Sequence, residues 1–209
     1  MSPASRAVGH LAKPPPPAQL KAAFPSRDYA PGTVVLRSHG HGKEPRWFSC
    51  SGAGRFDLAT PDGTCYLAES EVVTLLEAWG GLQVVPDYKA AERDSSRLRL
   101  DKGATVADLT SNLAIQYGVT SEIFSTTDYG LTQLWASALR QAGFGGIRYW
   151  ARHDLAHTAG CLALFGAADP KKPLAGFEVD NTDHLPARAD LLDELERETG
   201  ITVLPVPPI

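Results

Sequence analysis

The sequence is poor in cysteine and has no long hydrophobic run. Its three cysteines, Cys50, Cys65 and Cys161, lack the Cys-x-x-Cys spacing of a zinc or redox motif. The pattern indicates neither a disulfide framework nor a zinc site, so we expect reduced thiols, two of them in strands. No apolar run reaches the roughly 18 residues of a membrane-spanning helix, and no signal peptide opens the chain. We therefore expect a cytoplasmic protein without a membrane partner.

Basic residues are also in the minority. The chain has 20 Lys and Arg against 24 Asp and Glu, which gives a formal net charge of −4. Proteins that grip nucleic-acid phosphates are usually basic, so we expect no direct nucleic-acid partner. What remains is an ordinary globular composition, with 43% hydrophobic and 21% charged residues over 209 positions. That length suits one sizeable domain.

The first 30 residues differ from the rest in composition. They contain four consecutive prolines, Pro14 to Pro17, among small and basic residues, and such a segment prefers an extended conformation. We predict that residues 1–30 form a flexible leader or a strap across the surface. Residues 31–209 are then expected to form a single domain.

Hydrophobic periodicity and turn residues predict an irregular mixture of strands and helices. Strands are expected at 33–37, 64–68, 82–85, 97–100, 146–149, 159–165, 174–179 and 201–204. Helices are expected at 70–79, 105–109, 111–117, 128–142 and 187–199. Helices that interrupt strands without a regular βαβ alternation are typical of a mixed α+β domain.

The stretch from residue 54 to residue 77 is the most informative part of the chain. A short apolar strand at 64–68 leads directly into the helix at 70–79, whose buried stripe is expected to include Val72, Leu75, Leu76 and Trp79. Glu77 lies on the other side of that helix. Its carboxylate either faces solvent or faces a cleft, and residue type alone favours solvent.

The segment His39-Gly40-His41-Gly42 contains a possible pair of metal ligands. Its glycines favour a loop, and no third ligand with suitable spacing lies nearby in the sequence. We interpret these histidines as ordinary loop residues and expect no metal.

Four short motifs occur in a characteristic order. They are a strand that ends in arginine, a Gly-Arg-aromatic step, a Tyr/Ala/Ser/Leu-Glu pattern across a strand and a helix, and a Gly-Ile-x-Tyr strand followed by one that ends in Leu-Phe. In this chain they read Val35-Leu36-Arg37; Gly54-Arg55-Phe56; Tyr66, Ala68, Ser70, Leu76 and Glu77; Gly146 to Tyr149 and Leu164-Phe165. Over roughly Val34 to Phe165 the chain therefore resembles the RES-domain family, which is named for an arginine, a glutamate and a serine.

The resemblance implies a fold and an activity. RES proteins are toxins of toxin–antitoxin pairs that destroy NAD+. Their fold is α+β, with a mixed, mainly antiparallel β core and flanking helices, similar to ADP-ribosyltransferases. By resemblance we expect cleavage of the nicotinamide–ribose bond by water or by phosphate, with NAD+ as substrate and with no cofactor. An Xre-type antitoxin is the implied protein partner, and the oligomeric state is left open.

The same resemblance assigns roles to individual residues. Glu77 is expected to stabilise positive charge on the ribose, and Arg37 to bind the pyrophosphate, because paired guanidinium donors match phosphate oxygens. The predicted substrate-binding residues are Tyr66, Arg55, Arg152 and His153. Each has an ordinary alternative: a surface ion pair for Arg37, a core hydroxyl for Tyr66, a loop anchor for Arg55 and a polar loop for the last two.

One position departs from the family pattern. Ala151 stands where the family tends to have its serine. Either another hydroxyl, such as Thr158 or Ser125, takes that role, or the chain has lost part of its activity. ADP-ribosyl transfer to a protein, and NAD binding without turnover, therefore remain alternatives to NAD+ cleavage.

Overall fold

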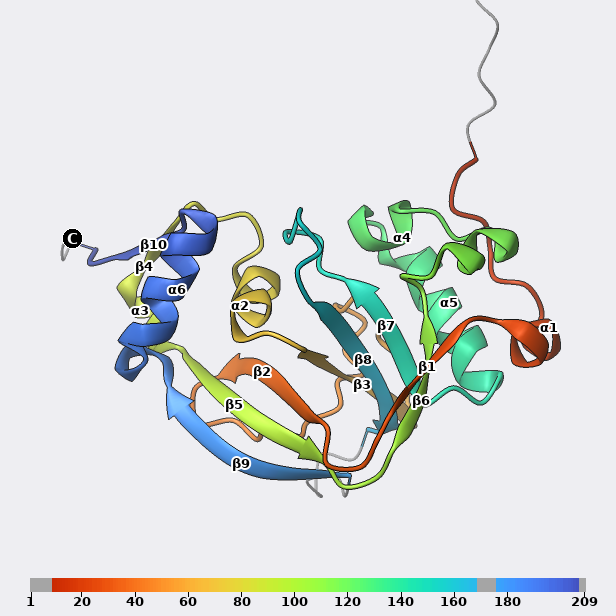
Figure 1. Cartoon of the computed structure of the whole chain (residues 1–209), viewed down its shortest axis with the longest axis horizontal. Coiled ribbons are helices and arrows are strands. Elements are labelled where there is room, and N and C mark those ends of the chain that lie inside the picture. Colours follow the sequence, from red (N-terminus) through yellow and green to blue (C-terminus); the bar gives the residue numbers. More distant parts are fainter. Residues whose placement is uncertain (1–8, 169–175, 207–209) are drawn as a thin grey trace, which may run out of the picture.

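An eight-stranded sheet forms the centre of the protein (Figure 1). The computed structural model describes residues 9–168 and 176–206. The strand order is β1-β6-β7-β8-β3-β2-β5-β9, and β6–β7 is the parallel pair while the other neighbours run antiparallel. Two further strands, β4 and β10, form a small parallel sheet. The predicted fold class, α+β with a mainly antiparallel core and flanking helices, is confirmed.

The elements have the following bounds. The strands are β1 Ser26–Tyr29, β2 Val34–Gly40, β3 Asp62–Ala68, β4 Val84–Pro86, β5 Arg93–Leu100, β6 Ala104–Asp108, β7 Gly146–Trp150, β8 Gly160–Ala167, β9 Phe177–His184 and β10 Thr202–Leu204. The α-helices are α1 Pro17–Ala23, α2 Glu71–Trp79, α3 Asp87–Ala91, α4 Glu122–Ser125, α5 Tyr129–Gln141 and α6 Ala189–Thr199. Two 3₁₀ helices are η1 Asn112–Tyr117 and η2 Leu185–Ala187.

The sheet is loosely joined at its middle. Strands β2 and β3 share a single Cα pairing, Leu36 with Ala68, whereas β2 pairs with β5 along seven residues. Strands that meet at one point and then diverge leave room between them for other side chains. Arg37 follows Leu36 directly, and Tyr66 precedes Ala68 by two residues. The divergence therefore places both residues beside the same opening.

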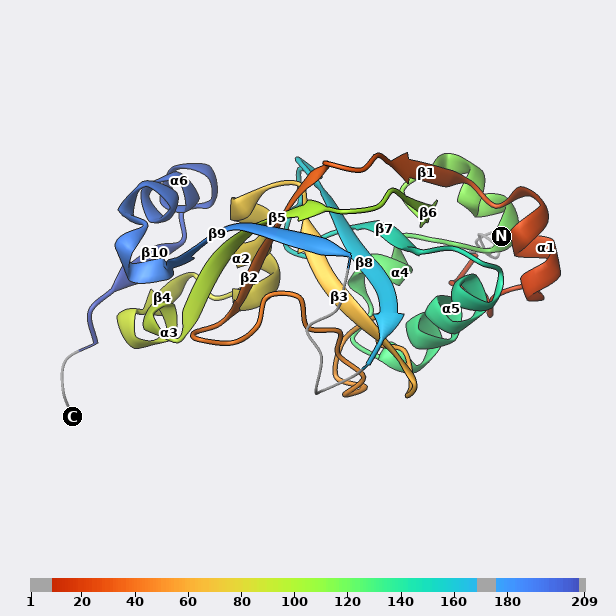
Figure 2. The same ribbon diagram turned by 90° about the horizontal axis from the view of Figure 1, so that it is seen from below.

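Helices gather at the two ends of the sheet, with α2 between them (Figures 1 and 2). At one end, α1, η1, α4 and α5 pack on β7 and β8 around the fully buried Trp135 and Ile147. At the other end, α3, α6 and the small sheet share a separate core with α2, around Leu75, Leu191 and Leu195. The predicted apolar stripe of α2 is confirmed, since its four residues are buried in that core.

The N-terminal segment is part of the domain where the structure describes it. Proline at the start of α1 suits a helix, because its fixed φ is preorganised and its missing N–H needs no partner there. Leu20 in α1 is fully buried, the ring of Phe24 packs at a tilt against that of Tyr117, and β1 pairs with β6 at the sheet edge. The prediction of a flexible leader is therefore wrong for residues 17–29. Residues 1–8 lie outside the described residues.

Replacing Leu20 with alanine tests this correction. Since its side chain is 0% exposed, we expect a loss of about 2–5 kcal/mol in the free energy of unfolding. Leu113, which is 60% exposed, gives a matched control whose replacement by alanine should change stability by less than about 0.5 kcal/mol. Chemical denaturation measures both. Equal, small effects would restore the leader interpretation.

Two other local predictions are wrong. The helix predicted at 105–109 is the strand β6, because pairing with β1 on one side and β7 on the other overrides the local helical pattern. The apolar periodicity of the helix at 128–142 predicts that Leu134 is buried with Trp135 and Leu139, but Leu134 is 51% exposed. The strand predicted at 174–179 falls partly outside the described residues, and its described part lies in β9.

Candidate active site

A cleft of about 910 Å³ opens where β2 and β3 diverge. This volume lies within the roughly 300–1,000 Å³ typical of small-molecule and cofactor sites. Its walls come from β2, β3, α2, the start of β5, the loops at residues 43–55 and the loop after β7. All six residues proposed from the sequence line it: Arg37, Arg55, Tyr66, Glu77, Arg152 and His153. The structure brings them together, while their roles in catalysis stay predictions.

Glu77 is held by one donor on each carboxylate oxygen. The Tyr149 hydroxyl donates to Oε2 at 3.1 Å, and the backbone N–H of Arg152 donates to Oε1 at 3.2 Å. Burial, together with the neighbouring Glu77 carboxylate, raises the pKa of Tyr149 well above its usual value. The phenol therefore stays protonated and acts as a donor. Glu77 is exposed on the outer face of α2, and these two hydrogen bonds hold its carboxylate at the wall of the cleft.

Arg37 uses one of its nitrogens to hold the loop that follows β2. Nη1 donates to the carbonyl oxygens of Pro45 and Trp47, the latter at 2.9 Å, and lies 3.1 Å from Cys65 Sγ. Within the described residues, Nε and Nη2 have no hydrogen-bond partner. Because Arg37 lines the cleft, these donors are available to an anionic ligand.

Arg93 is a further cation in the cleft, and sequence reasoning missed it. Its Nε donates to Ser38 Oγ at 2.8 Å, and its Nη2 donates to the Ser38 carbonyl at 3.2 Å. Burial and then the charge of Arg37 lower the pKa of Arg93, and both residues line the cleft. Only the pairing of β2 with β5 indicates its position, because that pairing places Arg93 opposite Gly40 at the end of β2.

The Tyr66 hydroxyl lies within a small hydrogen-bond network. It accepts from the backbone N–H of Phe56 at 2.8 Å and donates to Asp57 Oδ1 at 2.9 Å. Burial, with the Asp57 charge, raises the pKa of Tyr66 far above its usual value. Both hydrogen bonds of the hydroxyl are therefore made within the protein, as expected for the core hydroxyl considered from the sequence. Tyr66 nevertheless lines the cleft.

Gly54 of the Gly-Arg-aromatic motif makes this network possible. A Cβ at residue 54 would lie 2.5 Å from the Tyr66 hydroxyl oxygen and closer still to Asp57 Oδ1. We expect Gly54→Ala to lower the free energy of unfolding by about 1–3 kcal/mol, because the added methyl overpacks the site. Gly9→Ala is the control, since a Cβ there meets nothing within 4 Å. Equal melting temperatures for the two variants would refute this explanation of the motif.

Arg55 fixes the cleft wall to neighbouring helices. It is 8% exposed, donates to the carbonyl oxygen of Thr126 at 2.7 Å, and its guanidinium lies 5.0 Å from the centre of the Tyr129 ring. These contacts favour the anchoring role over phosphate binding. Tyr129 itself lines the cleft and was missed from the sequence.

The loop after β7 positions Arg152 and His153 but supplies no serine. Ala151 is 1% exposed and belongs to the core. Thr158 donates its hydroxyl to Asp154 at 2.9 Å, and Ser125 donates to the Ser121 carbonyl at 3.2 Å. Neither hydroxyl is among the described residues that line the cleft. The two replacements considered from the sequence therefore do not occupy the site.

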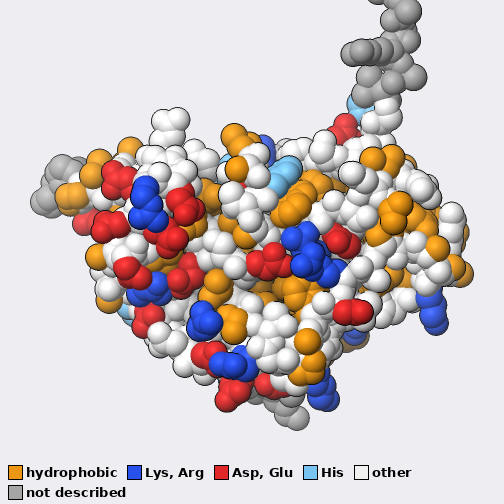
Figure 3. Space-filling model, viewed as in Figure 1, with side chains coloured by type: hydrophobic (Ala, Val, Ile, Leu, Met, Phe, Trp, Pro, Cys, Tyr) orange, Lys and Arg blue, Asp and Glu red, His pale blue; other side chains and the backbone are white. Residues whose placement is uncertain are grey.

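Three further features of the structure bear on the expectations from composition: the cysteines, the helix lengths and the surface charges. All three cysteines are free thiols, with Cys65 in β3 and Cys161 in β8, as predicted. Among the described residues, no helix is long and apolar enough to cross a membrane. On the face seen in Figure 3, acidic and basic side chains lie interspersed.

A family model described as the RES domain matches residues 34–188 of this chain. The match covers well over half of the sequence. The chain belongs to the RES domain family. The matched region contains every described residue that lines the cleft, from Arg37 to Cys161, and leaves out α1, β1, α6 and β10. The resemblance proposed from the motifs is therefore confirmed, and the whole candidate site lies inside the RES domain.

The RES domain also has a solved structural relative. The crystal structure of the M. tuberculosis MbcT-MbcA toxin–antitoxin complex contains a chain that matches with a TM-score of 0.60. Sequence identity is 17%, and the match covers 87% of this chain and 97% of that chain. A comparison with curated protein sequences gave no match. At this identity the likeness supports the fold of the RES domain.

Proposed function

We propose that this RES domain cleaves the nicotinamide–ribose bond of NAD+. The observation that carries the proposal is the shared cleft, in which a fixed carboxylate, Glu77, accompanies two guanidinium groups, Arg37 and Arg93. A dinucleotide needs both kinds of group, because its reacting ribose becomes cationic while its pyrophosphate is anionic. The cleft volume is adequate for a ligand of this size.

The chemistry requires little beyond positioning and charge. The C1′–N bond breaks and its electron pair leaves with nicotinamide, which departs as a neutral molecule and needs no general acid. Positive charge builds on the ribose, and a preorganised carboxylate stabilises it. Tyr149 and the Arg152 N–H hold Glu77 in place, so the carboxylate need not reorganise during the reaction.

The arginines fit the anionic part of the substrate. Nε and Nη2 of Arg37, which have no partner among the described residues, match paired phosphate oxygens, and Arg93 adds positive charge to the same cleft. In phosphorolysis, another arginine of the cleft would hold a phosphate ion opposite the departing nicotinamide, where the phosphate would serve as the nucleophile. Water would serve in hydrolysis.

Product analysis tests the proposal. Purified protein is mixed with NAD+, with and without inorganic phosphate, and products are identified by mass spectrometry. Nicotinamide with ADP-ribose indicates hydrolysis, and nicotinamide with ADP-ribose 1″-phosphate indicates phosphorolysis. Label from NAD+ on a protein band instead would favour ADP-ribosyl transfer. Intact NAD+ after long incubation would refute the enzymatic function.

Ala151 favours one second candidate, a RES domain that binds NAD+ without turning it over. A buried methyl replaces the hydroxyl that the family motif leads us to expect. Calorimetric titration of NAD+ alongside the product analysis separates the two functions. Saturable binding without nicotinamide release would establish the second.

We further propose that the protein acts as the toxin of a toxin–antitoxin pair. The support is family membership and the structural relative, which is itself part of a toxin–antitoxin complex. An antitoxin would inhibit by covering the cleft. Expression should stop bacterial growth, and co-expression of the neighbouring reading frame should restore it. Normal growth on expression alone would contradict the toxin function.

A further inference from the structure

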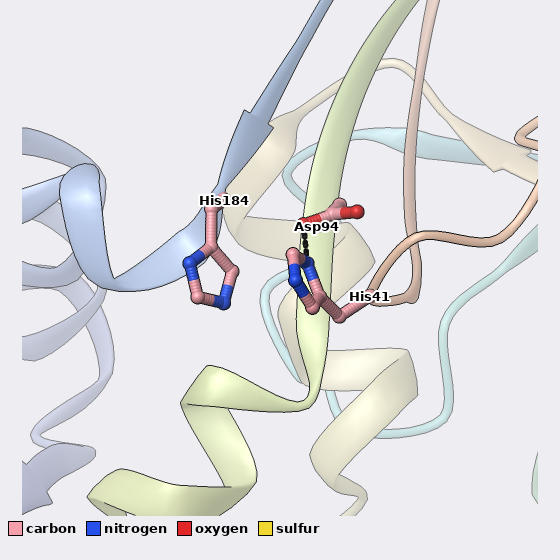
Figure 4. Close-up of side chains that lie close together, drawn as sticks. All are labelled: His41, Asp94 and His184. Carbon is pink, nitrogen blue, oxygen red and sulfur yellow. Dashed lines mark hydrogen bonds and ion pairs between the residues drawn. The ribbon is translucent and has the colours of Figure 1, made fainter.

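Three metal-binding side chains meet outside the cleft, at the edge of the sheet (Figure 4). His41 lies in the turn after β2, Asp94 is the second residue of β5, and His184 is the last residue of β9. Strand register brings them together, because Asp94 pairs with His184 across β5 and β9. The sequence hid this cluster, since the two partners of His41 lie 53 and 143 positions further along the chain.

The donor atoms are close and partly buried. One ligand atom from each residue lies within 4.8 Å of the other two. His41 Nδ1 is 2.7 Å from Asp94 Oδ1, and the two imidazole rings stack with centroids 4.1 Å apart. The side chain of Asp94 is 7% exposed and that of His41 is 55% exposed. The carboxylate is therefore fixed, while one face of the cluster is open to solvent.

We propose that His41, Asp94 and His184 bind a divalent transition-metal ion of the zinc class. Two imidazoles and one carboxylate are ligands that Zn²⁺ takes in three-residue sites, which leave a fourth position for water. Calcium and magnesium prefer oxygen ligands, so the donor set selects against them. The exposed side of His41 provides the open position.

The surrounding contacts resemble those that orient metal ligands. The backbone N–H of Gly42 contacts Asp94 Oδ2 at 2.8 Å, which directs Oδ1 toward His41. His184 Nε2 contacts the Ala91 carbonyl at 2.8 Å. Outer contacts of this kind fix the orientation of ligands. His39 is not part of this cluster, because its Nε2 forms a hydrogen bond with Ser96 Oγ at 2.8 Å.

Metal binding requires a modest rearrangement. Ligand atoms around a four-coordinate zinc ion lie about 3.3 Å apart, given bonds of about 2.0–2.1 Å. The stacked rings must therefore turn so that their lone pairs converge, and the exposed His41 has the freedom to do so. The ion would replace the contact between His41 Nδ1 and Asp94 Oδ1.

Such a site would tie the cleft wall to the sheet. The turn that contains His41 lies between His39-Gly40 and Lys43-Glu44, and all four of these residues line the cleft. A metal ion would cross-link this turn to β5 and β9. The proposal is nevertheless independent of NAD+ cleavage, because its test measures metal alone.

Cobalt titration tests the site. Protein purified without a histidine tag and freed of metal with a chelator is titrated with Co²⁺, and visible absorption reports the coordination. We expect one equivalent to bind with the intense bands of a four- or five-coordinate site, and Zn²⁺ to displace it. His41→Ala and His184→Ala should each weaken binding by more than about 100-fold, beyond the effect of losing an outer contact.

His10→Ala is the matched control. His10 contacts a carboxylate, Glu122, at 2.8 Å, and among the described residues this pair has no third ligand. The variant should bind Co²⁺ as the wild type does. Because His41 is exposed, its replacement should leave the fold intact, which circular dichroism verifies. Weak octahedral spectra, or equal binding by the His41 and His10 variants, would overturn the proposal.

Discussion

Glu77→Gln is expected to slow nicotinamide release from NAD+ by about 100- to 1,000-fold, the usual cost of removing one preorganised electrostatic group from an active site. Glutamine keeps the size, and its amide oxygen can accept from the Arg152 N–H while its amide nitrogen donates to the Tyr149 hydroxyl oxygen, but it loses the charge that stabilises the cationic ribose. Ground-state contacts change little, so the loss should fall on kcat rather than on KM. Steady-state assays of nicotinamide release measure both constants.

Glu196→Gln provides the control for this prediction. Glu196 is also an exposed glutamate on a helix, but it lies on α6, away from the cleft lining. The substitution removes the same charge and should leave the rate unchanged. If both variants retained the wild-type rate, Glu77 would have no role in the chemistry and the assignment of the carboxylate would fail.

Arg37→Ala should weaken NAD+ recognition by about 10- to 150-fold, which corresponds to the roughly 1.5–3 kcal/mol of a hydrogen bond to a charged group. The effect should appear mainly in KM, because the pyrophosphate is bound in both the ground state and the transition state. Arg37→Lys keeps the charge but loses the paired donors, so it should recover only part of the affinity.

Two measurements separate substrate binding from the structural role of Arg37. Its Nη1 also holds the carbonyl oxygens of Pro45 and Trp47, so melting temperatures must accompany the kinetics. Arg97→Ala is the control, since Arg97 lies on β5 with its side chain 56% exposed and 3.8 Å from Asp180. An Arg37→Ala variant with reduced stability but unchanged KM would assign the residue to loop anchoring alone.

The parts of the site that could be predicted from the sequence are local ones. Arg37 on a strand and Glu77 on the outer side of α2 follow from patterns a few residues long, although β2 continues to Gly40 and does not end at Arg37 as predicted. The family motifs placed Tyr66, Arg55 and the loop at 152–153 beside them, and one cleft includes them all. The apolar stripe of α2 was likewise readable, because helical periodicity determines which face is buried.

The parts that were missed depend on pairing between distant segments. Arg93 lies in the cleft because β5 starts four residues earlier than its alternating pattern indicates and pairs with the end of β2. His184 meets His41 through the register of β9, which no local pattern encodes. The proline-rich segment was misread for a related reason: Leu20 and Phe24 are too few to indicate a core element, yet they bury against α5 and η1.

A crystal structure of the Glu77→Gln variant soaked with NAD+ tests the central claim most directly. The slow variant should retain intact dinucleotide. The account predicts the nicotinamide ribose against residue 77 and the pyrophosphate against Nε and Nη2 of Arg37, inside the cleft between β2 and β3. NAD+ bound at another surface, or a cleft that stays empty at saturating NAD+, would contradict it.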